Sequence, residues 1–310
     1  MSNDKRLDFV NSWPNTALFP AEQAFDELLR NLNGRQCFHP HRFLPTSDRE
    51  AHITISYLID ALGSLPKRPD HAFDWIWRAM ENIVTSYASG NITDCLRVEA
   101  APKILGCLRS DARLHRAFFN LLDKIPYQTC EYLFKQVAAG KPYSVSSKNH
   151  AAMSKFGKRL LLRSGSGEIT SYPLQFFLTA LTTKYDYSNH SQRRNGAALL
   201  RLGIQGGLLR IGNAELQLAD SDRLFFLLSG LGYSFRNDRA HANSIAPFQS
   251  SYASLKTYAH CWFMFLFVYQ SLICYLKTIS SAVPLDGDTV QNFYENTDSY
   301  VALFKREIAQ

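Results

Sequence analysis

Blocks of like charge, internal repeats and low-complexity stretches are all missing from this chain of 310 residues. Charged residues make up only 20% of it and apolar residues 46%, so the composition argues against wholesale disorder and favours a sizeable core. The formal net charge of +7 is a modest excess. It favours a polyanionic partner such as nucleic acid without requiring one.

Paired cysteines are missing as well. The six cysteines stand at positions 37, 95, 107, 130, 261 and 274, and none forms a Cys-x-x-Cys pair. We expect them to be reduced in an intracellular protein. The segment Cys37-Phe38-His39-Pro40-His41 collects metal-binding residue types, but no second cluster has zinc spacing. Gly165-Ser166-Gly167 lacks the lysine of a phosphate loop. Neither a metal nor another cofactor is therefore expected.

No leader and no membrane span of full length is apparent. Residues 2–6 are polar and no apolar stretch follows them, which favours a cytoplasmic location. The apolar segment Cys261–Leu276 is short of the roughly 20 residues that span a bilayer, and it contains Gln270 and Ser271. We expect a buried core helix and no stable membrane insertion. A helix facing a dimer partner, or an anchor in a membrane-associated protein, are the alternatives.

Apolar residues recur with helical periodicity along most of the chain. This pattern predicts a mainly α fold: a multi-helix bundle with one or two small β-hairpins. We expect Ser47, in a Ser-Asp-Arg-Glu capping box, and Asp70 to cap two of the helices. Pro102 should interrupt another, and Gly230 and Gly232 should kink the helix that begins at Asp222. The expected helices cover residues 21–33, 47–63, 71–88, 93–108, 111–125, 129–139, 146–162, 174–184, 222–236, 251–280 and 288–308.

The middle of the chain carries two hairpin patterns. One pairs residues 159–163 with 168–172 around Ser-Gly-Ser-Gly. The other pairs 207–211 with 214–218 around Gly212-Asn213, which suits a primed two-residue turn. A boundary is expected at Gly140-Lys141-Pro142. It would separate an N-terminal helical domain, 1–140, with a role in sensing, partner binding or regulation, from a C-terminal domain, 141–310.

The richest concentration of chemistry is Arg236-Asn237-Asp238-Arg239-Ala240-His241. RNA can be cleaved by its own 2′-hydroxyl, provided that protons are moved and the charge on the five-coordinate phosphate is stabilised. Histidine titrates near neutrality, arginine matches phosphoryl oxygens with a planar fork, and asparagine can orient or donate without adding charge. We therefore predict Arg236, Asn237 and His241 as catalytic residues, with no metal required.

Spacing limits how these residues can meet. On a regular helix Asn237 and His241 share a face, whereas Arg236 and His241 lie roughly 140° apart around the axis. The arginine and the histidine can converge through the long Arg236 side chain, through a distorted turn, or through a partner chain. In the last case two copies of the segment would face each other across a twofold axis and form one composite cleft.

This pattern resembles the HEPN superfamily of ribonucleases, whose motif is Arg, four to six residues and His, often with Asn, Asp or His after the Arg. The resemblance covers roughly residues 220–280, and not residues 1–140 or the hairpins. It implies an all-α, homodimeric, metal-independent endoribonuclease that acts as a toxin or antiviral defence effector. Other copies of the loose spacing, at Arg35…His41 and Arg109…His115, lack Asn at the second position.

Neighbouring residues are secondary candidates. Arg239 could contact RNA phosphate or be an ordinary surface charge, and Tyr233, Asn243 and Ser244 are close enough in sequence to line a substrate cleft. Asp238 is expected to be a salt-bridge partner rather than an acid catalyst.

Two features elsewhere in the chain bear on the same cleft. Glu81, in the helix with Trp77 and Arg78, could orient Arg236 from another helix, or it could pair with Arg78. A basic run could guide RNA or form a solvated helix face: Lys148, Lys155, Lys158, Arg159 and Arg163.

The sequence is therefore compatible with two functions. The first is an endoribonuclease with RNA as its substrate, working as a homodimer and controlled by a regulatory protein or ligand at the N-terminal region. The second is a non-catalytic helical dimer that binds RNA or another protein, in which the motif is kept for structure.

Overall fold

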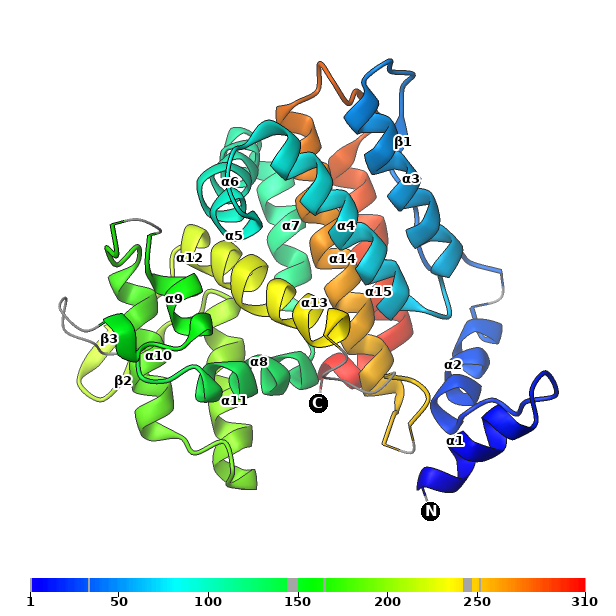
Figure 1. Ribbon diagram of the computed structural model, residues 1–310, viewed down its shortest axis with the longest axis horizontal. Coiled ribbons are helices and arrows are strands. Elements are labelled where there is room, and N and C mark those ends of the chain that lie inside the picture. The colour runs from blue at the N-terminus through cyan, green and yellow to red at the C-terminus, as the bar shows by residue number, and fades with distance from the viewer. Residues whose placement is uncertain are drawn as a thin grey trace.

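A central helix organises the fold of the computed structural model, which describes residues 2–32, 34–143, 150–163, 166–241, 247–250 and 252–309 (Figure 1). This helix, α14, spans Leu255–Thr278, and every residue from Tyr258 to Leu276 is buried. A helix that is apolar on all sides needs protein around it, and here the remaining helices provide that cover. By length and composition α14 could cross a membrane, but it is enclosed by the fold. The prediction of a buried core helix over 261–276 is confirmed.

Helices from both halves of the chain pack around α14. Buried residues on both sides of residue 140 belong to one continuous core, and the domain boundary there stays a prediction. Figure 1 shows α3 on the outer side of α4, and α12 and α13 crossing the front of the molecule. The helices in contact with α14 are α2 (Pro20–Arg30), α4 (Pro69–Tyr87), α6 (Ala101–Ser110), α7 (Ala112–Asp123), α8 (Tyr127–Ala139) and α15 (Thr289–Ala309).

The remaining helices extend this bundle. Helix α11 packs on α8, and α10 packs on both of them. A π-helical segment, Leu96–Ala100, joins α5 to α6, so the predicted interruption near Pro102 is a change of helix type rather than a break. These further helices are α1 (Ser2–Asn11), α3 (Arg49–Ser64), α5 (Ile92–Cys95), α9 (Lys155–Leu161), α10 (Tyr172–Lys184), α11 (His190–Ile204) and a 3-10 turn at His150–Ala152.

Two small antiparallel sheets complete the fold. Strands β2 (Leu209–Ile211) and β3 (Ala214–Leu216) form the second predicted hairpin, and Gly212 takes the positive φ of 60° that its turn needs. Strands β1 (Arg42–Phe43) and β4 (Leu285–Asp286) pair across most of the sequence. Local pattern carries no signal for such a long-range pairing, and it was not predicted.

The first predicted hairpin is wrong. Residues up to Leu161 belong to α9, and only an isolated bridge between Leu162 and Ile169 remains. Phe156, Leu160 and Leu161 are buried together, which follows the helical period rather than the alternation of a strand. The helix α11 had not been predicted.

Both predicted caps are also wrong. Asp48, not Ser47, caps α3 by accepting a hydrogen bond of 2.7 Å from the amide of Ala51. Helix α4 begins at Pro69, so Asp70 lies inside its first turn and its carboxylate pairs with side chains instead of capping the helix.

Candidate functional site

The motif lies on a helix that changes type just before it. Helix α12 (Asp220–Phe225) runs into a π-helical segment, Phe226–Gly232, and then into α13 (Tyr233–Ala240). A side chain at Gly232 would come within 2.7 Å of the Trp77 ring, so the glycine lets α13 begin close against α4. The kink predicted at the two glycines is thus a wider helical turn, a feature that is frequent at functional sites.

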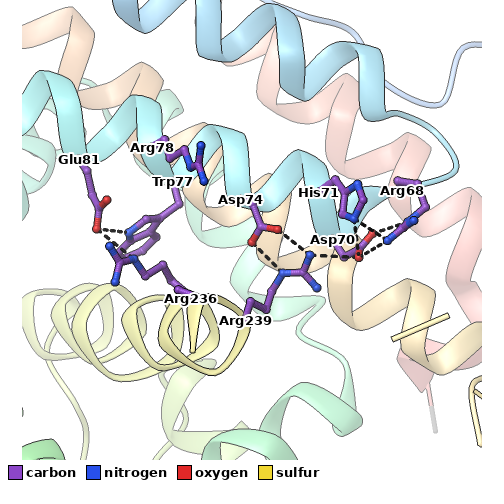
Figure 2. Close-up of a pocket in the computed structure, with 10 residues that line it drawn as sticks. Arg68, Asp70, His71, Asp74, Trp77, Arg78, Glu81, Arg236 and Arg239 are labelled. Carbon is purple, nitrogen blue, oxygen red and sulfur yellow. Dashed lines mark hydrogen bonds and ion pairs between the residues drawn. The ribbon is translucent and has the colours of Figure 1, made fainter. Parts of the chain in front are cut away.

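Arg236 is held from two sides. Its Nε lies 3.4 Å from Oε1 of Glu81 on α4, and its Nη1 donates to Oδ1 of Asn237 at 3.1 Å (Figure 2). The Arg236 side chain stays 34% exposed, so part of its fork faces solvent. Of the two partners considered for Glu81, the structure selects Arg236.

Glu81 is itself fixed by a buried ring. The indole Nε1 of Trp77, one turn earlier on α4, donates to Oε1 of Glu81 at 2.8 Å. Trp77 is fully buried against Phe73 and the ring of Tyr233. The carboxylate that faces Arg236 therefore has little freedom to rotate away.

Arg239, one turn after Arg236, lies in a buried ion-pair network. It binds both carboxylate oxygens of Asp74, at 2.7 and 2.6 Å, and approaches Asp70 at 3.1 Å. Asp70 is fully buried and also binds Arg68 through two hydrogen bonds. Burial alone would lower the pKa of Arg239, but the Asp74 hydrogen bond and the charge of Asp70 outweigh it and raise that pKa.

This network changes the expectation for Arg239. Only 13% of its side chain is exposed, and its charge is already matched by two carboxylates. Contact with an RNA phosphate would require this ion pair to open. The observed geometry therefore gives Arg239 a structural role in joining α13 to α4, while phosphate contact stays an untested prediction.

These groups share one pocket of about 360 Å³ between α4 and α13. Figure 2 shows Glu81, Arg78 and Arg236 at one end, Arg239 with Asp74 in the middle, and Asp70 with Arg68 at the other end. The pocket is lined by Arg68, Asp70, His71, Asp74, Trp77, Arg78, Glu81, Arg236, Arg239 and Ala240.

His241 follows directly after α13 and is exposed. Its amide donates to the carbonyl of Asn237 at 3.0 Å, which closes the last helical turn. Within the described ranges its imidazole makes no hydrogen bond, to Arg236 or to any other residue. The structure thus joins Arg236 to Asn237, whereas the imidazole stands apart at the end of the helix. Asn243 and Ser244 lie outside the described residues.

The other motif neighbours have defined places. Tyr233 lies one turn before Arg236, and its ring stacks under the guanidinium of Arg159 at 4.4 Å. Asp238 accepts hydrogen bonds from Tyr132 at 2.8 Å and from Gln136 at 3.0 Å, so it connects α13 to α8. This agrees with a structural rather than a catalytic role for Asp238.

The basic run on α9 does not act as a single surface. Arg159 turns inward, donates to the Ser229 carbonyl at 2.7 Å and to the Ser234 hydroxyl at 2.8 Å, and braces the motif helix. Burial lowers the pKa of its guanidinium. Lys155 and Lys158 are exposed, and Lys148 lies outside the described residues.

Metal-binding residue types do not gather in the part of the chain that the structure describes, where no three His, Cys, Asp or Glu side chains converge. His41, from the cluster near the N-terminus, is buried. Its Nε2 lies 3.0 Å from the Thr289 hydroxyl, and its Nδ1 lies 3.0 Å from the Arg42 carbonyl.

Sequence reasoning named Glu81 as a partner for Arg236 but missed Asp70 and Asp74 as acidic residues of this site. Asp70, Asp74, Arg78 and Glu81 fall at helical spacing on α4, together with Trp77. A polar stripe along an otherwise apolar helix was the available signal. It did not name a partner, because the arginines of α13 are more than 150 residues away in sequence.

No family model, no curated protein and no solved structure matches this chain. The site is therefore interpreted from its own geometry.

If this site cleaves RNA as the sequence predicts, replacing Glu81 by glutamine should slow cleavage by about 10- to 100-fold, because Arg236 loses the charge that orients it and small misplacements at a reacting centre are costly. The fold should persist, since the amide can still accept from Trp77. Cleavage rates and thermal melting of the variant would be compared with those of Glu50→Gln. Glu50 is also a half-buried, paired carboxylate, but on α3. Equal rates in the two variants would remove Glu81 from the site.

Proposed function

We propose that this protein is a metal-independent endoribonuclease in which Arg236, Asn237 and His241 carry the reaction. One observation carries the proposal. A partly exposed guanidinium, oriented by a carboxylate and a carboxamide, lies at the edge of a pocket on the helix turn that leads to an exposed imidazole.

The reaction needs two proton transfers and the stabilisation of a five-coordinate phosphate. The 2′-oxygen of a ribose bonds to the neighbouring phosphorus and loses its proton to a base. The bond from phosphorus to the 5′-oxygen breaks, and an acid returns a proton to that oxygen. The products are a 2′,3′-cyclic phosphate and a free 5′-hydroxyl. His241 performs one of the two proton transfers, and Arg236 stabilises the phosphorane.

Asn237 is assigned the orienting role. Its side-chain oxygen accepts a hydrogen bond from Arg236. Asn237 therefore orients the guanidinium of Arg236 and not the imidazole of His241. The motif supplies only one histidine from each chain, so one of the two proton transfers has no group from the same copy of the motif. In the proposal, the histidine of a second copy supplies it, so that two protomers share one cleft.

The biological setting is proposed from the same resemblance. A cytoplasmic nuclease of this kind is toxic to its own cell, which suits a toxin or an antiviral defence effector. The N-terminal region would then receive the controlling partner or ligand.

The direct test is cleavage of single-stranded RNA in EDTA. The parent protein should cut it, and His241→Ala should reduce the rate by at least about 100-fold, the lower end of what general acid–base catalysis contributes. The new 5′ ends should accept a phosphate from polynucleotide kinase without prior phosphatase treatment. His190→Ala, which removes an exposed histidine on α11, serves as the matched control.

The competing function predicts a different result. A non-catalytic RNA-binding dimer would retain RNA without cutting it, and His241→Ala would bind as the parent does. Cutting that survives in His241→Ala at the parent rate would point to a contaminating nuclease and overturn the assignment.

A further inference from the structure

The four arginines of the pocket are not equivalent. Arg68 and Arg239 form ion pairs with Asp70 and Asp74, so their positive charges are neutralised by carboxylates. Arg78 is exposed and, among the residues that the structure describes, has no carboxylate partner. Unmatched positive charge therefore lies at the end of the pocket where Arg78 and Arg236 both line the wall (Figure 2).

Arg78 is nevertheless held in place. Its guanidinium lies over the ring of Trp75, 4.7 Å from the centroid, and Trp75 in turn stacks on Tyr57 of α3 at 6.2 Å. Stacking uses the face of the guanidinium and leaves its N–H groups free at the edge. An arginine restrained in this way loses less side-chain entropy when it binds an anion.

Arg78 also lies close to the residue that holds Arg236. It precedes Glu81 by three positions on α4, and side chains three apart on a helix are neighbours. Glu81 contacts Arg236, so Arg78 lies next to the carboxylate that holds Arg236, and both arginines line the same pocket.

We propose that Arg78 binds a backbone phosphate of the RNA beside the scissile one, so that Arg78 and Arg236 set the register of the strand across the pocket. This rests on the proposed function for the identity of the ligand. A small anion held by the rest of the pocket is disfavoured, because the carboxylates of Asp70, Asp74 and Glu81 line it.

Binding measured without cleavage tests this. His241→Ala protein would be titrated onto a fluorescent single-stranded RNA of about 12 nucleotides in EDTA, with fluorescence anisotropy as the readout. The salt would be raised from about 50 to about 200 mM. Adding Arg78→Ala should weaken binding roughly tenfold at low salt, the loss of one charge-assisted hydrogen bond. The slope of log K against log salt should become shallower by about 0.7, the value for one phosphate contact on a single strand.

The controls separate the loss of this phosphate contact from a change in net charge and from a loss of folding. Arg113→Ala removes an exposed arginine, 70% accessible, on α7 and should leave the slope unchanged. Arg78→Lys should keep the slope, because the charge remains, and lose part of the affinity. Thermal melting of all variants should match the parent, since Arg78 is exposed.

Three outcomes can be told apart. If the parent cleaves RNA but Arg78→Ala binds with the same affinity and slope, Arg78 is no subsite and the nuclease assignment stands. If the parent binds RNA through Arg78 but does not cleave it, the subsite holds and the nuclease assignment falls. If the His241→Ala protein binds no RNA at any salt concentration, this inference is wrong.

Discussion

Replacing Arg236 by alanine is expected to reduce RNA cleavage by about 100- to 1000-fold, the usual cost of removing one donor that stabilises developing charge in a transition state. The fold should change little, because the side chain is partly exposed and Glu81 keeps its hydrogen bond from Trp77. Single-turnover rates on a short RNA, together with thermal melting, would measure both effects. An increase in KM with an unchanged kcat would instead indicate binding common to ground and transition states.

Arg236→Lys is the sharper control for this prediction. Lysine keeps the charge but cannot donate to Asn237 and to a phosphate oxygen through one planar fork. We expect it to remain closer to alanine than to the parent in cleavage rate. Parent-like cleavage by the lysine variant would show that only a point charge is needed at this position. A melting temperature far below that of the parent would make Arg236 structural.

Replacing Asp70 by alanine is expected to lower the free energy of unfolding by about 3–5 kcal/mol, because Arg68 and Arg239 would lose a fully buried partner. The midpoint of thermal unfolding should fall by roughly 5–8 °C. The matched control is Glu215→Ala, which breaks an exposed ion pair with Arg210 and should cost less than about 1 kcal/mol.

The loss at Asp70 should depend on pH. Burial by itself would raise the pKa of Asp70, but the Arg68 hydrogen bond and the charges of Arg239 and Arg68 outweigh it, and the pKa lies below its ordinary value. A carboxyl whose pKa is depressed by folding adds stability above its unfolded pKa and loses it as pH falls through the folded value. The difference in unfolding free energy between parent and Asp70→Ala should therefore shrink below about pH 4. A difference that stays constant down to pH 2 would contradict the ion-pair explanation.

The same network links stability to the site. Arg239 and Arg236 are one helical turn apart on α13, and both are held by carboxylates of α4. Two ion pairs therefore join α13 to α4: that of Arg239, which is buried, and that of Arg236, which lies at the edge of the pocket. Asp70→Ala should loosen the orientation of Arg236 as well as the fold, whereas Glu81→Gln should affect the site alone.

Prediction from sequence worked where neighbouring residues decide the outcome. The wholly apolar segment around Phe263 and Phe267 had to be enclosed, and the Gly212-Asn213 pair had to turn a hairpin. It was divided at Leu160 and Leu161, which lay in both a predicted helix and a predicted strand because two buried leucines fit either, and the structure places them in α9. It also misjudged Asp70, since an acidic residue is common at helix starts and nothing local signals the ion pair with Arg239.

The sequence by itself determined a mainly α chain, its buried central helix and the position of an Arg-Asn-x-x-x-His segment, because periodicity and composition act over a few residues. Only the tertiary structure decided that Glu81 faces Arg236, that Arg239 is matched by Asp74 and Asp70, and that Arg78 has no carboxylate partner among the residues described. The physical reason is that the packing of α4 against α13 decides which carboxylate of α4 lies next to which arginine of α13. That packing depends on contacts between residues that lie far apart in the chain.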